Sequence, residues 1–297
     1  MTDRRRLKSN GRVADAALRG QVAAARFVAP VPMRVARPVT PLWDSPPGGA
    51  SRRMRELVLH EAFQVLETGG TWVFGYAERD GYAGYMARDA VADAALVRPT
   101  HVIAARQSYL TGVPALKNSA GMVPVSFGTA LEVTGTHHEG GRWAEVSVLR
   151  PGGPDGRGTV ATRYVPAVHL SSVAALAPDP VAVAERFLGT PYHWGGNSGF
   201  GVDCSGLVQM ACLACGIACP GDSDQQQAEL GVALPAGSPR RRGDILFWKG
   251  HVAMAVNEST LIHANAHHMA VTYEDADAAI ARIAAQGDGP VTAHRRL

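Results

Sequence analysis

The sequence predicts an α+β protein in which two small β-barrels precede a C-terminal domain of helices and antiparallel strands. At 297 residues the chain suggests two or three domains. Short strand-like runs separated by turn residues fill the first part, and a helical pattern followed by strands fills the last. We expect a helical or disordered tail at 1–29, barrels at 30–98 and 99–174, and the last domain at 175–297.

The first barrel is predicted by apolar runs that are each about one strand long. Pro46-Pro47-Gly48-Gly49 and Arg79-Asp80-Gly81 are typical turn sequences between such runs. Short strands at this spacing favour a small barrel. The runs begin at Met33, Glu56, Ala62, Thr71 and Gly81.

The second barrel has a weaker pattern of the same kind, which suggests a loose two-fold repeat. Its strands are expected at 128–135 and 143–148, with a loop from Pro151 to Gly158 and a last strand and turn at 164–170. The stretch 174–180 then reads as the link to the last domain.

The last domain begins with a helix that has Asp179 as its N-cap and Pro180 at its first position. A second helix is expected from Asp203 to Gly216, because glycine commonly terminates helices. The segments 243–248, 251–256 and 260–264 are predicted to be antiparallel strands. A helix followed by such strands indicates an α+β domain.

Composition excludes several function classes. Lysine and arginine exceed aspartate and glutamate by only 29 − 26 = 3, so no strongly basic face for nucleic acid is expected. No apolar run approaches the roughly 18 residues of a membrane span. The basic start lacks the apolar segment of a signal peptide, which leads us to expect a cytoplasmic protein.

The four cysteines lie close together, at positions 204, 212, 215 and 219. A secreted disulfide framework would spread them along the chain, and zinc normally takes four ligands, commonly as two pairs. We therefore interpret the last three as small buried side chains of one helix face, rather than metal or redox groups. We expect no metal and no organic cofactor.

Cys204 stands at the end of a glycine-rich loop and at the start of the predicted helix. The positive end of a helix lowers the pKa of a thiol, which makes the thiolate a nucleophile at neutral pH. His251 and His263 follow in strand contexts, where one ring can act as base and the second can orient it. Taken singly, these residues could equally be a buried thiol and polar strand residues.

The order of several motifs identifies a resemblance. Pro191-Tyr-His-Trp-Gly-Gly, Asp203-Cys-Ser-Gly-Leu, Gly243-Asp-Ile-Leu-Phe-Trp, His251-Val-Ala and Ile262-His-Ala follow one another. Residues 181–297 thereby resemble the NlpC-type family of papain-like cysteine peptidases, which cut bacterial cell-wall peptides. The resemblance implies Cys204 as nucleophile, His251 as base and His263 as its orienting partner. The segment around Asp80-Gly-Tyr is similar to the bacterial SH3-like modules that often precede such domains.

The resemblance also implies residues that bind substrate. Tyr192 would help the Cys204 N–H to stabilise the oxyanion, although a packed loop aromatic is the alternative. Asp203 would neutralise a substrate ammonium, which would explain a carboxylate beside a thiol whose pKa it raises; a helix N-cap is the alternative. The remaining candidates are Ser205, Asp222 and Ser223 in the last domain and Glu61 and Tyr82 in the first barrel, where ordinary barrel positions are the alternative.

Some members with two leading barrels cut the γ-D-glutamyl–diamino acid bond of wall peptides that have a free N-terminal L-alanine. The resemblance therefore implies a peptidase that releases L-Ala-γ-D-Glu from murein tripeptides or tetrapeptides in wall-peptide recycling. The alternatives are an endopeptidase or amidase acting on intact wall and, less favoured, a non-catalytic peptide-binding protein. The diamino acid (meso-diaminopimelate or L-lysine), the oligomeric state and the role of the second barrel stay open.

Overall fold

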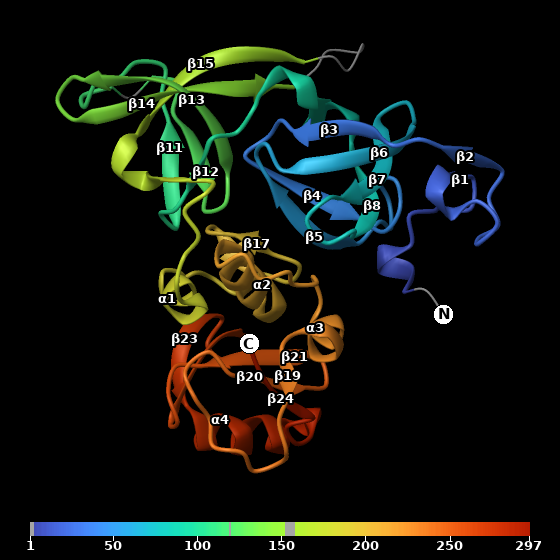
Figure 1. The fold of residues 1–297 in the computed structure, drawn as a ribbon, viewed down its shortest axis with the longest axis vertical. Coiled ribbons are helices and arrows are strands. Elements are labelled where there is room, and N and C mark those ends of the chain that lie inside the picture. The colour runs from blue at the N-terminus through green and yellow to red at the C-terminus, as the bar shows by residue number, and fades with distance from the viewer. Residues whose placement is uncertain (1–2, 119, 152–157) are drawn as a thin grey trace. The chain divides into compact units, whose positions relative to one another are not determined.

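The structure is a computed structural model that describes residues 3–118, 120–151 and 158–297. The chain forms two compact units, Met1–Ala174 and Ala175–Leu297. The first contains the blue-to-green strands of Figure 1 and the second the yellow-to-red helices and sheet. The mixture of helices and sheets confirms the predicted α+β class. None of the helices in these ranges combines the length and apolarity that a bilayer crossing requires.

The N-terminal segment differs from the expected helical or disordered tail. It forms 3₁₀ turns at Arg4–Arg6 and Ala16–Leu18 and a parallel pair of short strands, β1 (Val13–Asp15) and β2 (Arg26–Val28). Val13 is fully buried against the first barrel, and burying a valine side chain is worth about 1.5–3 kcal/mol. This long-range burial holds the segment in place, and local sequence patterns do not report it.

Polar contacts reinforce this packing. Asn10 and Arg12 donate to the carboxylate of Glu67 at 2.8 and 3.0 Å, and the Tyr76 hydroxyl donates to Asp15 at 3.0 Å. The Tyr76–Asp15 bond is buried, so it specifies how β1 sits on the barrel.

The first barrel is one antiparallel sheet with the strand order β5-β4-β8-β7-β6-β3-β9. Its core contains Leu42, Leu57, Phe63, Tyr82 and Met86. The predicted strands are present, within the predicted range 30–98. They are β3 (Val31–Val35), β4 (Val39–Trp43), β5 (Arg53–Val58), β6 (Ala62–Thr68), β7 (Trp72–Ala77), β8 (Ala83–Ala87) and β9 (Val91–Asp93), with 3₁₀ turns at Arg88–Ala90 and Ala94–Leu96.

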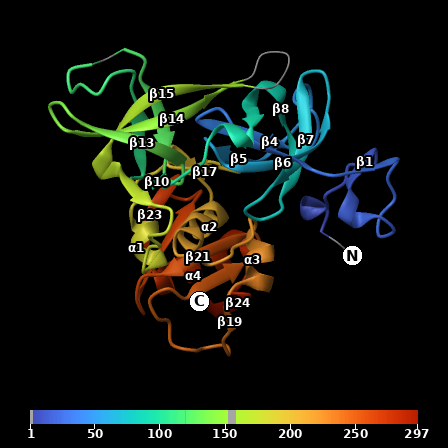
Figure 2. The same cartoon turned by 45° about the horizontal axis from the view of Figure 1, so that its top comes forward.

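The second barrel combines the sheet β15-β14-β13-β10-β16 with the hairpin β11-β12. Figure 2 shows the long strands β13, β14 and β15 side by side, in agreement with their pairing. The predicted loop from Pro151 to Gly158 lies mostly outside the described residues. The strands are β10 (His101–Ile103), β11 (Gln107–Leu110), β12 (Val123–Ser126), β13 (Ala130–His138), β14 (Arg142–Arg150), β15 (Thr159–Pro166) and β16 (Leu170–Ser172), with a 3₁₀ turn at Ala167–His169.

A turn between β5 and β6 joins the two barrels. Leu59 is buried in the core of the second barrel rather than the first. The fully buried His60 ring bonds the Ala130 carbonyl through Nδ1 (2.7 Å) and accepts the Leu149 N–H at Nε2 (2.9 Å). This pattern requires a neutral ring that carries its hydrogen on Nδ1.

This junction makes the stability of the first unit depend on pH. Burial lowers the pKa of His60 from 6.5 to about 4, so the unfolded chain binds more protons than the folded one between these values. The free energy of unfolding should therefore fall as the pH drops through that window. Calorimetry at about pH 7 and about pH 5 should show a smaller loss in His60→Asn. Asparagine suits the left-handed backbone here, φ 64°. An unchanged pH dependence in this variant would contradict the assignment.

In the second unit, a sheet with the strand order β19-β24-β20-β21-β22-β23 separates the helices. Figure 1 shows α1 and α2 on one side of it and α4 on the other. Ala276, Ala279 and Ile283 of α4 pack on Leu246 and Leu261 of the sheet. The helices are α1 (Pro180–Glu185), α2 (Cys204–Ala214), α3 (Ser223–Glu229) and α4 (Ala276–Ile283), followed by a π-helical turn at Ala284–Asp288.

The three predicted antiparallel strands at 243–248, 251–256 and 260–264 are present as β20, β21 and β22, and the structure adds further strands. Those of the sheet are β19 (Val232–Ala233), β20 (Ile245–Trp248), β21 (His251–Ala255), β22 (Thr260–Asn265), β23 (Ala270–Asp275) and β24 (Ala293–Arg296); the short pair β17 (Asn197–Ser198) and β18 (Gly201–Val202) precedes α2. The Asp179 side chain caps α1 as predicted, by accepting the Val181 N–H at 2.9 Å.

Candidate active site

Cys204 is the first residue of α2, and its neighbour Asp203 is the N-cap. One carboxylate oxygen of Asp203 accepts the Gly206 N–H at 2.7 Å, and the other accepts the Gly195 N–H at 3.0 Å. Asp203 thus ties the glycine-rich loop to the helix. A Cβ atom on Gly206 would lie 2.5 Å from the Gly196 carbonyl oxygen, so glycine is needed for this close approach. The N-cap interpretation of Asp203 is therefore confirmed, while a role in substrate binding stays a prediction.

The charge state of Cys204 differs from the sequence expectation of a lowered pKa. Burial and then the Asp203 carboxylate raise the pKa of the thiol to about 12, against the lowering effect of the N–H groups of Val252, Ser205 and Cys204 itself. The effect of burial exceeds that of the helix terminus because the Cys204 residue is only 6% exposed. Burial and the Asp203 carboxylate thus favour the thiol form of Cys204 over the thiolate.

His251 opens β21 directly after a tight turn. Trp248 pairs with His251 across that turn, and Gly250 has φ 77°, as the chain requires there. The N–H of Val252, the next residue, bonds to the Cys204 sulfur, so the start of β21 lies against the thiol. Burial, and then His263, lower the pKa of His251 to about 3. At neutral pH the ring is neutral and able to accept a proton.

The structure brings the two predicted histidines together. Nε2 of His251 lies 2.9 Å from Nδ1 of His263. His263 is 1% exposed, and burial lowers its pKa to about 4. His263 is thus a buried ring in direct contact with His251, and its role as third member of a triad stays a prediction.

Two residues beyond His263 were missed by the sequence analysis. Nε2 of His263 lies 3.0 Å from Oε2 of Glu274 in β23. Arg282 of α4 grips Glu274 with two hydrogen bonds, Nε to Oε1 at 2.8 Å and Nη2 to Oε2 at 2.7 Å. Finding Glu274 from the sequence would have required the pairing register of β22 and β23. In that register Thr272 lies opposite His263, and Glu274 lies diagonally from His263 on the same face of the sheet.

Tyr192 lies close enough to Cys204 and Asp203 to interact with them electrostatically. Burial, followed by Cys204 and Asp203, raises the pKa of its phenol above the ordinary value. The hydroxyl therefore keeps its hydrogen and is available as a donor. The Tyr192 backbone N–H donates to the Met269 carbonyl at 2.9 Å, which anchors this loop to the β22–β23 turn.

The other predicted residues of this unit gather around the start of α2. The Ser205 hydroxyl donates to Asp203 at 3.1 Å. Ser223 begins α3, with Asp222 as its N-cap residue. The buried Gln226 of α3 donates to the Ser205 carbonyl at 2.9 Å and so connects the two helix starts. The sequence analysis did not single out Gln226, which also donates to the Pro220 carbonyl at 2.9 Å.

Glu61 and Tyr82 belong to the first barrel and are described within that unit alone. One oxygen of Glu61 accepts from the Val58 N–H and from Arg79, both at 3.1 Å, and the other lies 3.0 Å from Arg79 Nε. Tyr82 is 2% exposed in the barrel core, with the Arg55 guanidinium over its ring. For both residues the structure shows barrel-internal roles, and their predicted contact with substrate stays a prediction.

The remaining cysteines are free thiols. Cys212 and Cys219 are buried and Cys215 is half-buried. The prediction that all three share one helix face is wrong, because α2 ends at Ala214, which leaves Cys215 as its C-cap and Cys219 in the segment that follows. Among the described residues, the histidines, cysteines and carboxylates form no group of three or more that could hold a metal ion.

Two segments of the sequence match known protein families. Residues 189–284 match the NlpC/P60 family, and residues 45–91 match the family described as the bacterial dipeptidyl-peptidase SH3 domain. The first match contains Tyr192, Cys204, both histidines and Glu274. The second covers most strands of the first barrel.

Curated relatives match over a similar part of the chain. Dipeptidyl-peptidase 6 of Lysinibacillus sphaericus is 34% identical over 103 residues, which are 33% of this chain and 36% of that protein. The γ-D-glutamyl-L-lysine dipeptidyl-peptidase of Bacillus subtilis is 38% identical over 110 residues, 34% of this chain and 36% of that protein. The chain thus aligns with just over a third of the length of these relatives.

A solved structure extends the likeness of the fold. The crystal structure of an NlpC/P60 family protein from Bacillus cereus covers 89% of this chain and 99% of its own, with a TM-score of 0.70 and 20% sequence identity. At that identity the likeness concerns the fold alone. The family matches themselves show an NlpC/P60 domain at residues 189–284, preceded by a bacterial dipeptidyl-peptidase SH3 domain at residues 45–91.

Proposed function

We propose that this chain is a cysteine peptidase that hydrolyses the γ-D-glutamyl–diamino acid bond of murein peptides and releases L-Ala-γ-D-Glu. The observation that carries the proposal is the contact of the Cys204 sulfur with the start of β21, whose first residue His251 is bonded to His263. The names of the relatives, one for a γ-D-glutamyl-L-lysine bond, support the class of substrate.

The proposed reaction begins with proton transfer from Cys204 to Nδ1 of His251 while the sulfur attacks the γ-carbonyl carbon of D-glutamate. The Cys204 N–H and the Tyr192 hydroxyl donate to the oxyanion. The carbon–nitrogen bond then breaks, His251 returns its proton to the leaving amine, and a thioester remains on Cys204. Water, deprotonated by His251, hydrolyses the thioester and regenerates the thiol.

Substrate selection is proposed to rest on the start of α2. A free N-terminal ammonium would be neutralised by Asp203, the carboxylate that adjoins Cys204 at the start of α2. Ser205 and Ser223 would donate to the α-carboxylate of D-glutamate, with Asp222 beside them. Gly221 stands where the family often has an arginine, so this chain offers no charge there.

A substrate-binding role for Glu61 of the first barrel would require a change in its present ion pair. Glu61 already has Arg79 as its ionic partner, so a substrate ammonium would have to share or replace that pair. This observation favours a second candidate function, an endopeptidase or amidase of intact wall that needs no free amine. Recycling of wall peptides in the cytoplasm is part of the first proposal, and cell fractionation tests it.

One experiment separates the two functions. L-Ala-γ-D-Glu-meso-diaminopimelate and its N-acetylated twin are incubated with the protein, and the products are read by mass spectrometry. The L-lysine peptides run alongside and report the diamino acid. Release of L-Ala-γ-D-Glu from the free-amine peptides alone is the expected result. Equal cleavage of the acetylated peptides, together with activity on sacculi, would replace the proposal by the wall endopeptidase.

A further inference from the structure

We propose that Glu274, held by Arg282, is a positioning residue that sets the tautomers of His263 and His251 and so leaves the catalytic base able to accept the proton of Cys204. The inference rests on the proposed function for its kinetic consequence, but the tautomers themselves do not depend on the substrate. We call the hydrogen-bonded chain His251–His263–Glu274–Arg282 the relay. Its members lie on β21, β22, β23 and α4 in that order.

The first step is the charge of Glu274. Its hydrogen bonds with Arg282, and then with His263, hold its pKa at about 2. The carboxylate is therefore ionised at neutral pH and can only accept hydrogen bonds. Its side chain is 12% exposed, and that of Arg282 is 18% exposed. The ion pair is consequently largely shielded from water and keeps its geometry.

The second step assigns the hydrogens on the ring nitrogens of His263 and His251. Because Oε2 of Glu274 only accepts, Nε2 of His263, at 3.0 Å, must carry the hydrogen. The neutral His263 ring then has its lone pair on Nδ1, which faces Nε2 of His251 at 2.9 Å. Nε2 of His251 must therefore donate. The remaining nitrogen, Nδ1 of His251, is left bare to act as the base.

The third step concerns charge during the reaction. When His251 takes the proton of Cys204 it becomes an imidazolium in a buried site. Glu274 raises the pKa of His251, whereas Arg282 and His263 lower it. His268 and Arg282 also lower the pKa of His263. Loss of the carboxylate would therefore leave the Arg282 charge unbalanced at the moment when positive charge develops.

The substitution Glu274→Gln tests the relay with little change of shape. In one orientation the amide N–H₂ faces His263, which would force the opposite tautomer on both rings. In the other it replaces Oε1 and faces the Nε–H of Arg282. In both orientations the amide N–H₂ meets an N–H of Arg282, because Oε2 also accepts from Nη2. Either way the negative charge is lost. We expect kcat to fall about 10- to 100-fold with KM within about threefold, less than the ~10⁴-fold loss on replacing the direct partner of a catalytic histidine.

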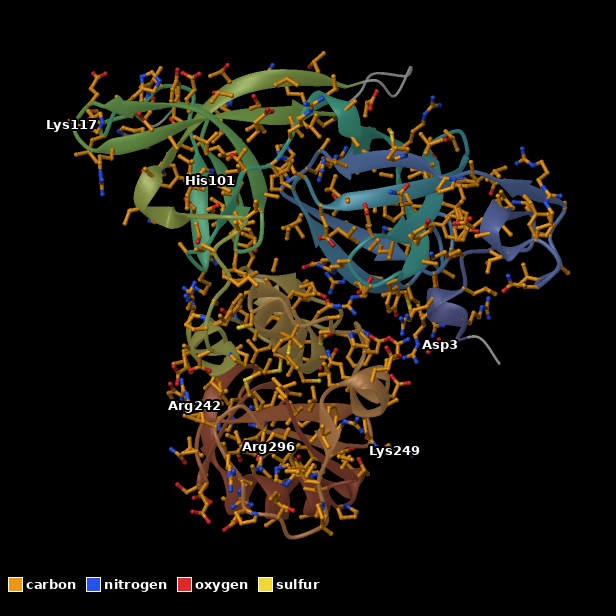
Figure 3. All side chains as sticks on the ribbon, viewed as in Figure 1. Asp3, His101, Lys117, Arg242, Lys249 and Arg296 are labelled. Atoms are coloured by element: carbon orange, nitrogen blue, oxygen red, sulfur yellow. The ribbon has the colours of Figure 1, made fainter. Side chains whose placement is uncertain are left out.

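The second unit offers a matched control. Asp244 bonds Nε2 of His294 at 2.9 Å, and Arg296 grips it at 2.7 Å with both Nε and Nη2. Figure 3 labels Arg296 within this unit. Within the described residues, the hydrogen bonds of the Asp244 side chain are to Arg241, His294 and Arg296, and not to Cys204, His251 or His263. Asp244→Asn should therefore lower the melting temperature without lowering kcat in the folded protein.

Two measurements test the relay without a substrate. Nitrogen-15 NMR of labelled histidine should show hydrogen on Nε2 of both His251 and His263 in the wild type, and a disturbed pattern in Glu274→Gln. Alkylation of Cys204 by iodoacetamide should slow in the same variant. Glu274→Asp, which restores the charge, should recover part of both kcat and the alkylation rate.

The outcomes separate the inference from the proposed function. A wild-type protein that cleaves no wall peptide would overturn the proposed function, and the NMR and alkylation results would then decide the relay alone. If Glu274→Gln does not fold, the tautomers of the wild type still decide it. Hydrogen on Nδ1 of His263 in the wild type, or wild-type kcat and alkylation in folded Glu274→Gln, would overturn the inference.

Discussion

Replacing Cys204 with alanine is expected to lower the hydrolysis of L-Ala-γ-D-Glu-meso-diaminopimelate by about 10⁵- to 10⁶-fold, the range found when the nucleophile of a hydrolase is removed. In the proposed mechanism the Cys204 sulfur is the atom that attacks the γ-carbonyl carbon. Removing one buried sulfur leaves the cap of Asp203 and the packing of α2 intact. The measurement is the initial rate of product release by mass spectrometry, with peptide binding followed by calorimetry.

Cys215→Ala is the matched control for this prediction. It makes the same substitution on the C-cap residue of the same helix, where the thiol is half-buried. This variant should keep the wild-type rate. Hydrolysis by Cys204→Ala within about tenfold of wild type would mean that another group is the nucleophile.

The second large effect is expected at His263. His263→Ala should lower kcat by about 10³- to 10⁴-fold, because His251 then loses the acceptor that fixes its Nε2 hydrogen. The same substitution leaves the Glu274–Arg282 ion pair without its histidine. The measurement is kcat and KM with the same peptide, in protein shown to be folded by circular dichroism.

His263→Asn supplies the control, because an amide oxygen can accept from Nε2 of His251, as in the Cys-His-Asn arrangement of papain-like proteases. It should recover at least about tenfold of the activity lost in His263→Ala. Equal activity of His263→Ala and the wild type would remove His263 from the triad. The double variant Cys204→Ala/His263→Ala should be no slower than Cys204→Ala, since residues that act as a unit are not additive.

Features with a local cause were predictable from the sequence. The strand runs of the first barrel, the caps Asp179 and Asp203, and the tight turn at Gly250 follow from residue type and spacing within a few positions. The motif around Cys204 indicated the helix start, and the histidines indicated two neighbouring strands. Their 2.9 Å contact follows from a short hairpin.

Features set by long-range packing were not predictable. The pKa of Cys204 rises because burial outweighs the helix terminus, and burial is a property of the folded domain. Glu274 becomes visible only once the register of β22 and β23 is known. The N-terminal segment is ordered by Val13, which is buried against a barrel whose strands lie far along the sequence.

Trapping the covalent intermediate tests most directly whether Cys204 is the nucleophile. The protein is mixed with L-Ala-γ-D-Glu-meso-diaminopimelate, quenched in acid within one turnover, digested and mapped by mass spectrometry. We expect the peptide that contains Cys204 to gain the mass of L-Ala-γ-D-Glu less one water, as a thioester. The same adduct on another residue, or product released at the wild-type rate by Cys204→Ala, would contradict it.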